Sequence, residues 1–200
     1  MNYSESMLNK FKQCPRSAQF AYDLRIQKEK EDKDDHHLDY GAAGHDSLAV
    51  LYKGGTLIEA KQAFTKKYPR QLDPEDQGKT ESNWFNLLDW YSRTQFLADM
   101  ERYKVLSTEL YDKFEYAEEA GFVVKLDLVI EDRADGGIYG LDHKITGGKK
   151  VYLGQDFWGQ FNPNSQITKY ISNIKAKWGH CAGFYVNGFG MGFRERKNRE

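Results

Sequence analysis

The feature that most constrains the fold is a change in the spacing of apolar residues near residue 110. Upstream, apolar side chains recur at helical intervals, whereas downstream three runs alternate between apolar and polar side chains. These runs predict three successive strands of an antiparallel meander, over about 111–119, 121–132 and 136–146. The sequence ADGG at 134–137 predicts a tight turn between the second and third strands. The chain should therefore form a sheet that follows a helical first half.

The remaining segments predict helices that flank this sheet. Helices are expected over 15–30, 38–52, 58–68, 84–103 and 165–177, with a loop over 72–82 and a closing strand over 182–189. The length of 200 residues fits one domain of ordinary size. We therefore predict an α/β fold, a mixed α+β sheet flanked by helices, in a single domain over 1–200. Its helical part covers about 1–110, and its sheet with one flanking helix covers about 111–192.

Composition excludes several classes of protein. The formal net charge is -1, so no overall basic field indicates nucleic acid, and a polyanion would have to be held by a local patch or by metal ions. The two cysteines, Cys14 and Cys181, are far apart in sequence and indicate neither a zinc site nor a disulfide framework. No run approaches the roughly 18 apolar residues of a membrane span, and the N-terminus lacks the apolar core of a signal peptide. We expect a cytoplasmic protein that does not bind membranes.

Polar side chains interrupt the second and third predicted strands. Asp127 is an acid within the apolar run VVKLDLVIED, and Asp142 and Lys144 flank His143 in GLDHKITGG. Because side chains alternate faces along a strand, Asp142 and Lys144 share one face and His143 points to the other. A turn centred between residues 134 and 135 places Asp127 opposite Asp142, and a turn centred on 135–136 places it opposite Lys144. Both registers bring Asp127, Asp142 and Lys144 to one face.

The chemistry of this face has two interpretations. Two facing carboxylates repel each other unless a cation or a shared proton lies between them. A hard divalent metal with oxygen ligands suits Asp127 and Asp142, and Lys144 can orient a water or stabilise a developing oxyanion. The alternative is an ordinary Asp–Lys ion pair on an exposed sheet face, with Asp127 solvated.

The same two motifs resemble a nuclease signature. Asp127 in VVKLDLVIED, followed by YGLDHKITGG, resembles the D…(D/E)-x-K signature of the PD-(D/E)-x-K nuclease superfamily, in its RecB/Cas4-like exonuclease branch. Three further segments resemble motifs of that branch in the same order. FKQCPRSAQFAYDL resembles its Cys-Pro segment, GAAGHDSL its Gly-x-x-His helix at His45, and QITKY its Gln-x-x-x-Tyr motif at Gln166 and Tyr170. The resemblance covers about residues 11–170 and implies a restriction-endonuclease-like core with a helical N-terminal half.

The resemblance also implies a site and an activity. The metal ligands would be His45, Asp127, Asp142 and the backbone carbonyl of His143, and the metal would be Mg²⁺ or Mn²⁺. Lys144 would position the attacking water, so Asp127, Asp142 and Lys144 form the expected catalytic set. The implied reaction is metal-dependent hydrolysis of phosphodiester bonds in DNA by an exonuclease, in repair, recombination or phage DNA processing.

Residues around these motifs are expected to contact the DNA. Gln166 and Tyr170 are four residues apart, so they share one helix face and would border the site. A basic cluster would bind the DNA backbone, and the alternative is that these lysines only keep the protein soluble. The cluster comprises Lys149, Lys150, Lys169, Lys175 and Lys177. Members of the branch that carry an iron-sulfur cluster use four cysteines, and no cluster is expected in a chain that has only two.

Two other classes of function stay open. One is a non-catalytic nucleic-acid-binding or assembly module on the same fold, against which the intact Asp127, Asp142 and Lys144 argue. The other is a structural protein without a nucleic-acid role, for which the ordered motifs would be coincidence. The sequence identifies no protein partner in a recombination or replication complex.

Several residues near the motifs are not assigned to the site. Glu115 is within reach of the same sheet region, but we expect it to be solvated. The remaining histidines match no motif and are expected to be surface or packing residues: His36, His37 and His180.

Overall fold

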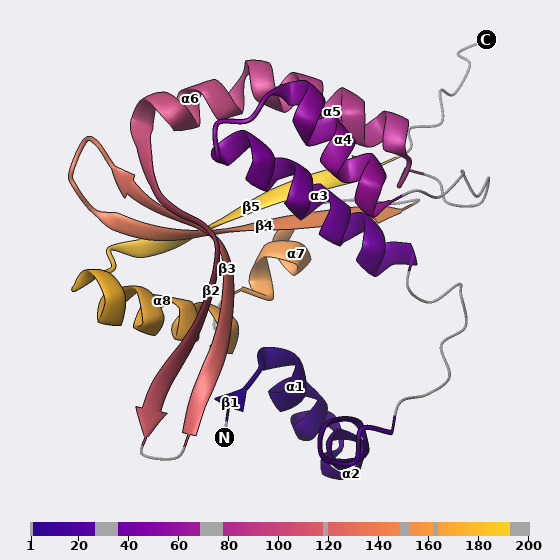
Figure 1. The fold of residues 1–200 in the computed structure, drawn as a ribbon, viewed down its shortest axis with the longest axis vertical. Helices are drawn as coiled ribbons and strands as arrows, with labels where there is room; N and C mark the ends of the chain where they lie inside the picture. The colour runs from indigo at the N-terminus through magenta and orange to yellow at the C-terminus, as the bar shows by residue number, and fades with distance from the viewer. Residues whose placement is uncertain are drawn as a thin grey trace.

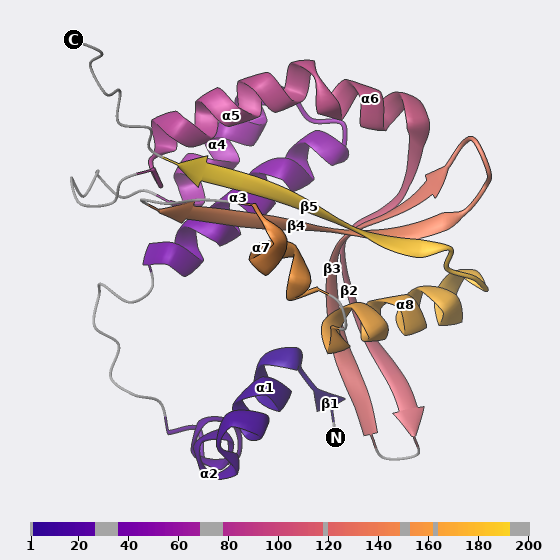
Figure 2. The same ribbon diagram turned by 180° about the vertical axis from the view of Figure 1, so that it is seen from behind.

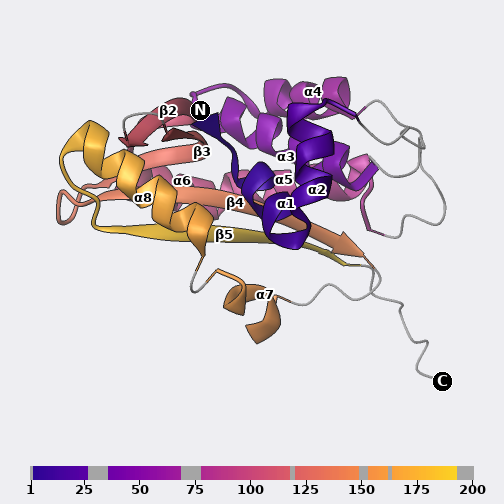
Figure 3. The same ribbon diagram turned by 90° about the horizontal axis from the view of Figure 1, so that it is seen from below.

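The structure, a computed structural model, describes residues 2–26, 36–68, 78–117, 120–148, 153–161 and 164–192. Its centre is a five-stranded mixed sheet with helices on both faces (Figure 1). One face is covered by α3 (His36–Tyr52), α4 (Leu57–Lys67), α5 (Glu81–Arg93) and α6 (Gln95–Arg102). The other face carries α7 (Gln155–Gly159) and α8 (Ser165–Trp178), as the view from below shows (Figure 3). The predicted fold class, a mixed sheet flanked by helices, is confirmed.

The strands comprise the predicted meander, the predicted closing strand and one short N-terminal strand that was not predicted. β2 (Tyr103–Ala117), β3 (Ala120–Asp132) and β4 (Ile138–Gly148) are antiparallel neighbours. β5 (Gly183–Gly192) lies parallel to β4, and the short β1 (Asn2–Tyr3) lies parallel to the start of β3. The alternating pattern and the turn at 134–137 are local signals, which is why they predict this part of the sheet well.

The two edges of β3 are used differently. One edge pairs with β2 from Ala120 to Asp132. The other edge pairs with β4 only over 128–131 and with β1 only at 121–122. Figures 1 and 2 show the reason, because β2 and β3 turn away from β4 and β5 below the point where the strands cross. The stretch of β3 between its two partners, 123–127, therefore borders an opening in the sheet.

Two apolar clusters lie on opposite sides of the sheet. The larger one packs α3, α4 and α5 against the sheet and is rich in aromatic rings; Phe64 and Trp84 stack with ring centroids 5.5 Å apart. The second places Tyr170 and Ile174 of α8 against Val124 of β3. Burying such side chains contributes roughly 1.5–3 kcal/mol each, so the two clusters hold the helices on the sheet.

The side chains of β3 switch from one face of the sheet to the other at Asp127, which simple alternation does not predict. Strict alternation along a strand would put Leu126, Leu128 and Ile130 on one face. Instead, Leu126 packs in the cluster under α8, and Leu128 and Ile130 pack in the cluster under α3–α5. The opposite residue on β2, Glu109, has a φ of 49° and interrupts the regular pairing at this level. A positive φ is uncommon for a residue other than glycine, so the backbone of β2 departs from regular strand geometry opposite Asp127.

The N-terminal segment differs from its prediction. A helix was expected over 15–30, whereas α1 (Glu5–Gln13) precedes it, and α2 (Pro15–Ala18) passes into a π-helical turn, η1 (Gln19–Asp23). Ser4 starts α1 by accepting a 3.2 Å hydrogen bond from the backbone N–H of Met7. Residues 27–30 of the predicted helix lie outside the described part of the chain.

Two further boundaries differ from the sequence prediction. The helix expected over 84–103 is two helices, α5 and α6, which are separated at Thr94. β2 begins at Tyr103 rather than at residue 111, because its first half pairs with the end of β3. Among the described residues, no helix combines the length and the apolar character needed to cross a membrane.

Candidate active site

The opening beside β3 holds a cavity of about 370 Å³. Its walls come from five parts of the chain: the start of α1, the helix α3, the end of α4, the strands β3 and β4, and the first half of α8. The lining residues are Ser4, Ser6, Ala42, His45, Asp46, Lys67, Val123, Lys125, Asp127, Asp142, Gln166 and Tyr170. The cavity therefore contains both predicted carboxylates, the predicted histidine, and the Gln–Tyr pair.

Asp127 is the central side chain of this cavity. Its carboxylate is 10% exposed, and both oxygens have partners. Oδ1 lies 3.0 Å from Nδ1 of His45, and Oδ2 accepts a 2.6 Å hydrogen bond from the backbone N–H of His143. The second bond ties β3 to β4 where the two strands separate, so Asp127 is fixed from both sides.

Asp142 and Lys144 lie on the cavity face of β4, as the alternation predicted. Lys144 Nζ is 2.6 Å from Asp142 Oδ2, and the Asp142 side chain is 7% exposed. The last regular pair of β3 and β4 is Leu128 with Leu141, which makes Asp127 and Asp142 the next opposed positions. The register with the turn centred between residues 134 and 135 is therefore correct, and the register that places Asp127 opposite Lys144 is wrong.

His45 reaches the cavity because α3 lies close to β4. Gly44 makes this approach possible, since a Cβ atom there would collide with Ile145 and come within 3.1 Å of the Trp84 ring. The next residue, His45, then faces Asp127, with 23% of its side chain exposed. In the sequence GAAGH, Gly44 thus allows the helix to approach the sheet, and His45 is positioned as a candidate ligand.

Glu109 is a site residue that the sequence analysis did not find. One ligand atom from each of His45, Glu109 and Asp127 lies within 4.8 Å of the other two. Glu109 also pairs with Lys125, whose Nζ is 2.8 Å from Oε2. Glu115, the glutamate considered instead, is exposed and borders a different hollow, near Asp112.

The signal for Glu109 was present but depended on where β2 begins. Thr108 pairs with Leu128, and Leu110 pairs with Leu126, so Glu109 stands opposite Asp127. Because the strand was predicted to begin at residue 111, this position was not assigned to the sheet.

The pKa values show how strongly these groups interact. Burial and the nearby charge of Asp127 raise the pKa of Asp142, although Lys144 partly offsets both. Burial also disfavours the charged form of Asp127, but the hydrogen bond and charge of His45 outweigh it and lower the pKa of Asp127. For His45, burial works against protonation, and the hydrogen bond and charge of Asp127 outweigh it, so its pKa is raised. Two buried carboxylates beside one imidazole form a site that favours a cation.

His143 has one role through its backbone and another through its ring. Its imidazole points to the opposite side from Asp142 and is 2% exposed, with the Tyr52 and Phe189 ring centroids each 5.6 Å away. Burial lowers its pKa to about 4, so the ring is neutral. Within the described part of the chain, neither ring nitrogen has a hydrogen-bond partner. The backbone carbonyl as a metal ligand stays a prediction.

Gln166 and Tyr170 stand at the cavity edge and also brace it. Nε2 of Gln166 donates to the Tyr170 hydroxyl at 2.5 Å, and this hydroxyl donates to the backbone carbonyl of Lys125 at 2.6 Å. The carbonyl belongs to the stretch of β3 that lacks a strand partner on this side. Tyr170 thus satisfies an acceptor at the opening, where an unpaired buried group would be costly.

Among the described residues, the lysines of the predicted basic cluster do not line this cavity. Lys149 and Lys150 lie outside the residues that the structure describes. Lys169 has its Nζ 4.7 Å from the centre of the Phe122 ring, and Lys177 pairs with Asp112. The lysines that do line the cavity are Lys67 and Lys125, which sequence reasoning did not select.

The donor set suits a hard divalent cation. His45, Glu109 and Asp127 form the close group of ligand atoms, and Asp142 lines the same cavity with one oxygen paired to Lys144. Carboxylate oxygens and an imidazole nitrogen are ligand types that Mg²⁺ and Mn²⁺ accept. No group of sulfur ligands exists, because the sequence holds only Cys14 and Cys181.

Comparison with known proteins points the same way. Residues 2–182 of the 200 match the sequence model of the PD-(D/E)XK nuclease superfamily. The match spans the N-terminal segment, the helices of α3–α6, the meander and α8, so it includes every wall of the cavity. No curated protein matches the chain.

Proposed function

The chain belongs to the PD-(D/E)XK nuclease superfamily, and on that basis we propose that it hydrolyses phosphodiester bonds in DNA with the help of Mg²⁺ or Mn²⁺. The observation that supports this most directly is the pair Asp127 and Asp142, buried at one opening in the sheet with Lys144 beside them. A surface ion pair would leave both acids in water, whereas here the pKa of Asp142 is raised by burial and by Asp127.

We propose that His45, Asp127, Asp142 and the carbonyl of His143 hold the metal, with Glu109 as a further ligand. When bound, a divalent cation neutralises charge on a scissile phosphate and lowers the pKa of a bound water. Asp127 is held rigidly by its bonds to His45 and to the backbone of His143, so it presents a fixed oxygen to the cation. Such preorganisation avoids the cost of reordering ligands when metal binds.

Lys144 would act on the water and on the phosphate. Its ammonium group lies 2.6 Å from Asp142, which lines the cavity, and the Lys144 side chain is 31% exposed, so water can reach it. There it can orient the attacking water by a hydrogen bond and offset negative charge in the transition state. Gln166 and Tyr170 would contact the DNA at the rim, and Lys67 and Lys125 would attract its phosphates.

The finer assignment rests on the ordered motifs. The Cys-Pro segment, the helix with His45 and the Gln-x-x-x-Tyr helix occur in the order of the RecB/Cas4-like branch. We propose membership of this branch, and with it exonuclease activity in DNA repair, recombination or phage DNA processing. Lys149, Lys150 and Lys169 remain proposed contacts to the DNA backbone.

One experiment separates this function from a non-catalytic binding module. End-labelled linear DNA and closed circular DNA would be incubated with Mg²⁺, Mn²⁺ or EDTA. We expect metal-dependent degradation of the linear form by the wild type and none by Asp142→Asn. The matched control is Asp112→Asn, which removes an acid from an ion pair outside the cavity and should keep activity. If the wild type binds DNA but degrades neither form with any metal, it is a binding module.

A further inference from the structure

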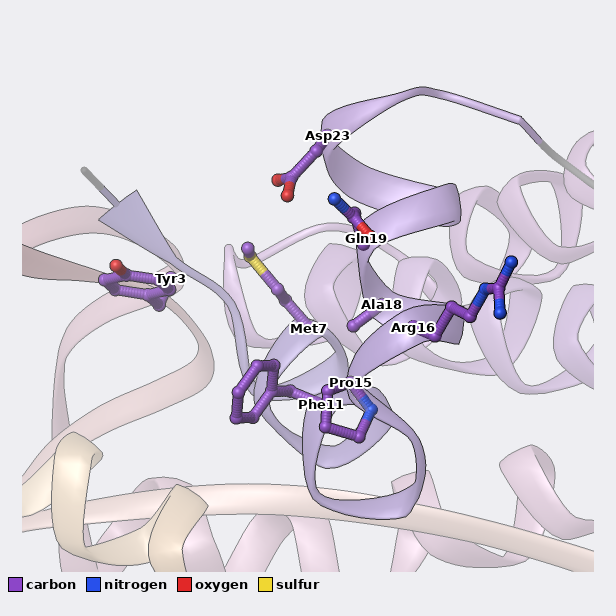
Figure 4. A pocket seen from close by; sticks show the side chains of 8 residues that line it. All are labelled: Tyr3, Met7, Phe11, Pro15, Arg16, Ala18, Gln19 and Asp23. Carbon is purple, nitrogen blue, oxygen red and sulfur yellow. The ribbon is translucent and has the colours of Figure 1, made fainter.

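A second hollow lies on the N-terminal segment, outside the carboxylate cavity. It has a volume of about 560 Å³ and lies between β1 with α1 on one side and α2 with η1 on the other. Figure 4 shows Tyr3 and Met7 on the first side and Gln19 and Asp23 on the second, with Phe11 and Ala18 at its floor. We call this hollow the N-terminal groove.

The groove combines flat apolar surface with polar groups at its mouth. Met7, Phe11 and Ala18 supply the apolar surface, and the Tyr3 ring borders it. Gln19 can donate and accept hydrogen bonds, and the carboxylate of Asp23 accepts them. A flat ring that carries N–H donors on its edge matches this arrangement, and nucleobases are such rings.

Three aromatic side chains are exposed along the same segment. Phe11 is 56% exposed, and Phe20 and Tyr22 are each 38% exposed. The guanidinium of Arg16 lies 5.5 Å from the centre of the Phe20 ring. Exposed aromatic rings interleaved with basic residues are the usual surface on which unpaired bases stack.

The charge of the segment complements a polyanion, although the whole chain does not. Residues 2–26 contain Lys10, Lys12, Arg16 and Arg25 against two acids, a formal charge of about +2, whereas the chain as a whole carries -1. The carboxylate of Asp23 at the mouth would repel a phosphate. This placement favours a base inside the groove and phosphates outside it, toward the lysines and arginines.

The groove and the carboxylate cavity share a wall. Tyr3 and Met7 line the groove, and Ser4 and Ser6, which lie between them in the sequence, line the cavity. Pairing of β1 with β3 at Gly121 and Phe122 fixes this wall to the strand that carries Asp127. The two hollows therefore lie on neighbouring residues of one segment.

We propose that the N-terminal groove binds an unpaired base of the DNA strand whose backbone enters the carboxylate cavity. This inference rests on the proposed nuclease function and specifies its substrate as single-stranded DNA or a single-stranded end. Bases in a duplex are stacked and paired, so their faces and edges are not available to the groove. The groove thus makes the protein select unpaired strands.

The test measures DNA binding without cleavage. Fluorescence anisotropy in EDTA would compare a labelled single-stranded oligonucleotide of mixed sequence with the corresponding duplex. We expect Phe11→Ala to weaken single-strand binding by about 5- to 150-fold, the loss typical of one base–aromatic stack. Phe11→Trp should restore binding, because it returns an aromatic face. Duplex binding should be weaker in the wild type and unchanged by Phe11→Ala.

Two exposed aromatic residues elsewhere provide matched controls. Trp90 is 60% exposed on α5, and Tyr111 is 64% exposed on β2. Trp90→Ala and Tyr111→Ala should bind single strands like the wild type. In cleavage assays with Mn²⁺, Phe11→Ala should raise KM for single-stranded DNA and leave kcat nearly unchanged, since the carboxylates and Lys144 are intact.

The possible outcomes separate this inference from the proposed function. If Phe11→Ala binds single strands like the wild type, or if both controls lose as much affinity, the groove is not a base site. Metal-dependent cleavage by the wild type in that case leaves the nuclease assignment intact. Conversely, single-strand binding that requires Phe11, in a protein that cleaves nothing with Mg²⁺ or Mn²⁺, supports the groove and rejects the nuclease.

Discussion

The two sides of the α3 helix differ in how their buried groups are satisfied. Toward α4 and α5, fully buried rings such as Phe64 and Trp84 pack against each other, and the indole N–H of Trp84 has its acceptor on Ser47. Toward β3 and β4, His45 meets buried carboxylates that repel each other. Close packing stabilises the fold, and the unbalanced charge of the cavity makes it receptive to a cation. Stability and activity should therefore respond to different substitutions.

The largest expected loss of stability comes from the aromatic side. Phe64 is 0% exposed and has ring contacts with Tyr40, Tyr68, Trp84 and Phe85. Phe64→Ala should lower the free energy of unfolding by about 3–5 kcal/mol, because it removes a buried ring and leaves a cavity. Urea denaturation measures this change. The folded fraction should still bind Mn²⁺ with nearly wild-type affinity, and a parallel loss of metal affinity would show that the two sides are not separate.

Lys144→Ala should reduce cleavage rather than stability, the reverse of Phe64→Ala. Cleavage should fall by about 10² to 10³, roughly 3–4 kcal/mol in the transition state, because a positioned cation is lost. Stability should fall less than in Phe64→Ala, because Asp142 can take up a proton once its partner cation is lost. Mn²⁺ should bind at least as tightly, since one cation no longer repels another. A DNA degradation time course, a Mn²⁺ titration and thermal melting measure the three quantities.

The chain offers a matched control for Lys144. Lys61 pairs with Asp89 at 2.7 Å and is 27% exposed, compared with 2.6 Å and 31% for Lys144 with Asp142. Lys61→Ala should leave cleavage unchanged. Cleavage by Lys144→Ala at the wild-type rate would make GLDHKITGG an ordinary strand with a charged face.

The sequence predicted the parts of the site that depend on local pattern. Alternation along one strand placed Asp142 and Lys144 together and His143 on the other face, and the ADGG turn limited the register to two possibilities. The choice between them required the geometry of the turn, in which the N–H of Gly136 bonds to the carbonyl of Asp132. Alternation cannot supply that information, since both registers keep the same residues on one face.

The parts that were missed depend on contacts between distant segments. β2 begins at Tyr103 because its first residues pair with the end of β3, so Glu109 could be assigned to the site only after that pairing was known. The opening beside 123–127 lies between the pairing of β3 with β4 and its short pairing with β1, which comes from the other end of the chain. No local period encodes either event, which is why the N-terminal wall of the cavity was not predicted.

Glu109→Gln tests the ligand that was missed. It should weaken Mn²⁺ binding by at least about 10-fold, the loss typical of removing a group that supports a metal site, because a charged oxygen donor becomes neutral. Isothermal titration calorimetry measures the affinity. Glu115→Gln, an exposed glutamate on the same strand, is the control and should bind Mn²⁺ like the wild type. Equal affinities in the two variants would remove Glu109 from the site.

The pH dependence of metal binding tests the charge balance of the cavity. Burial lowers the pKa of His45, but the contact with Asp127 outweighs burial and raises this pKa above its usual value of about 6.5. Metal needs the neutral imidazole, so Mn²⁺ affinity should rise with pH up to the pKa of His45 in the folded protein, by at most about 10-fold per pH unit. Calorimetry in buffers of different ionisation enthalpy should also detect release of a proton.

The same pKa shift has the opposite effect on the metal-free protein. Because the pKa of His45 is higher in the folded state, the His45–Asp127 pair stabilises the fold fully below about pH 6.5 and less as pH rises through the folded pKa. Metal affinity and metal-free stability should thus move in opposite directions. In His45→Gln both pH dependences should be reduced over this range, and a wild-type profile in that variant would assign them to another group.

The smallest effect on stability is expected for an exposed ion pair between β2 and β3. Lys104 Nζ lies 3.2 Å from Glu131 Oε2, a separation not far from that of Lys144 and Asp142, but the two side chains are 58% and 35% exposed. Water screens their attraction, so Lys104→Met should change the free energy of unfolding by at most about 1 kcal/mol and leave cleavage and Mn²⁺ binding unchanged. Chemical denaturation of Lys104→Met, Glu131→Gln and the double variant isolates the coupling between the two residues. A coupling well above that size would mean that an exposed ion pair on this sheet is worth as much as a buried one. Burial would then no longer distinguish Asp142 and Lys144 from a surface pair, and the case for their catalytic role would rest on the cleavage assays alone.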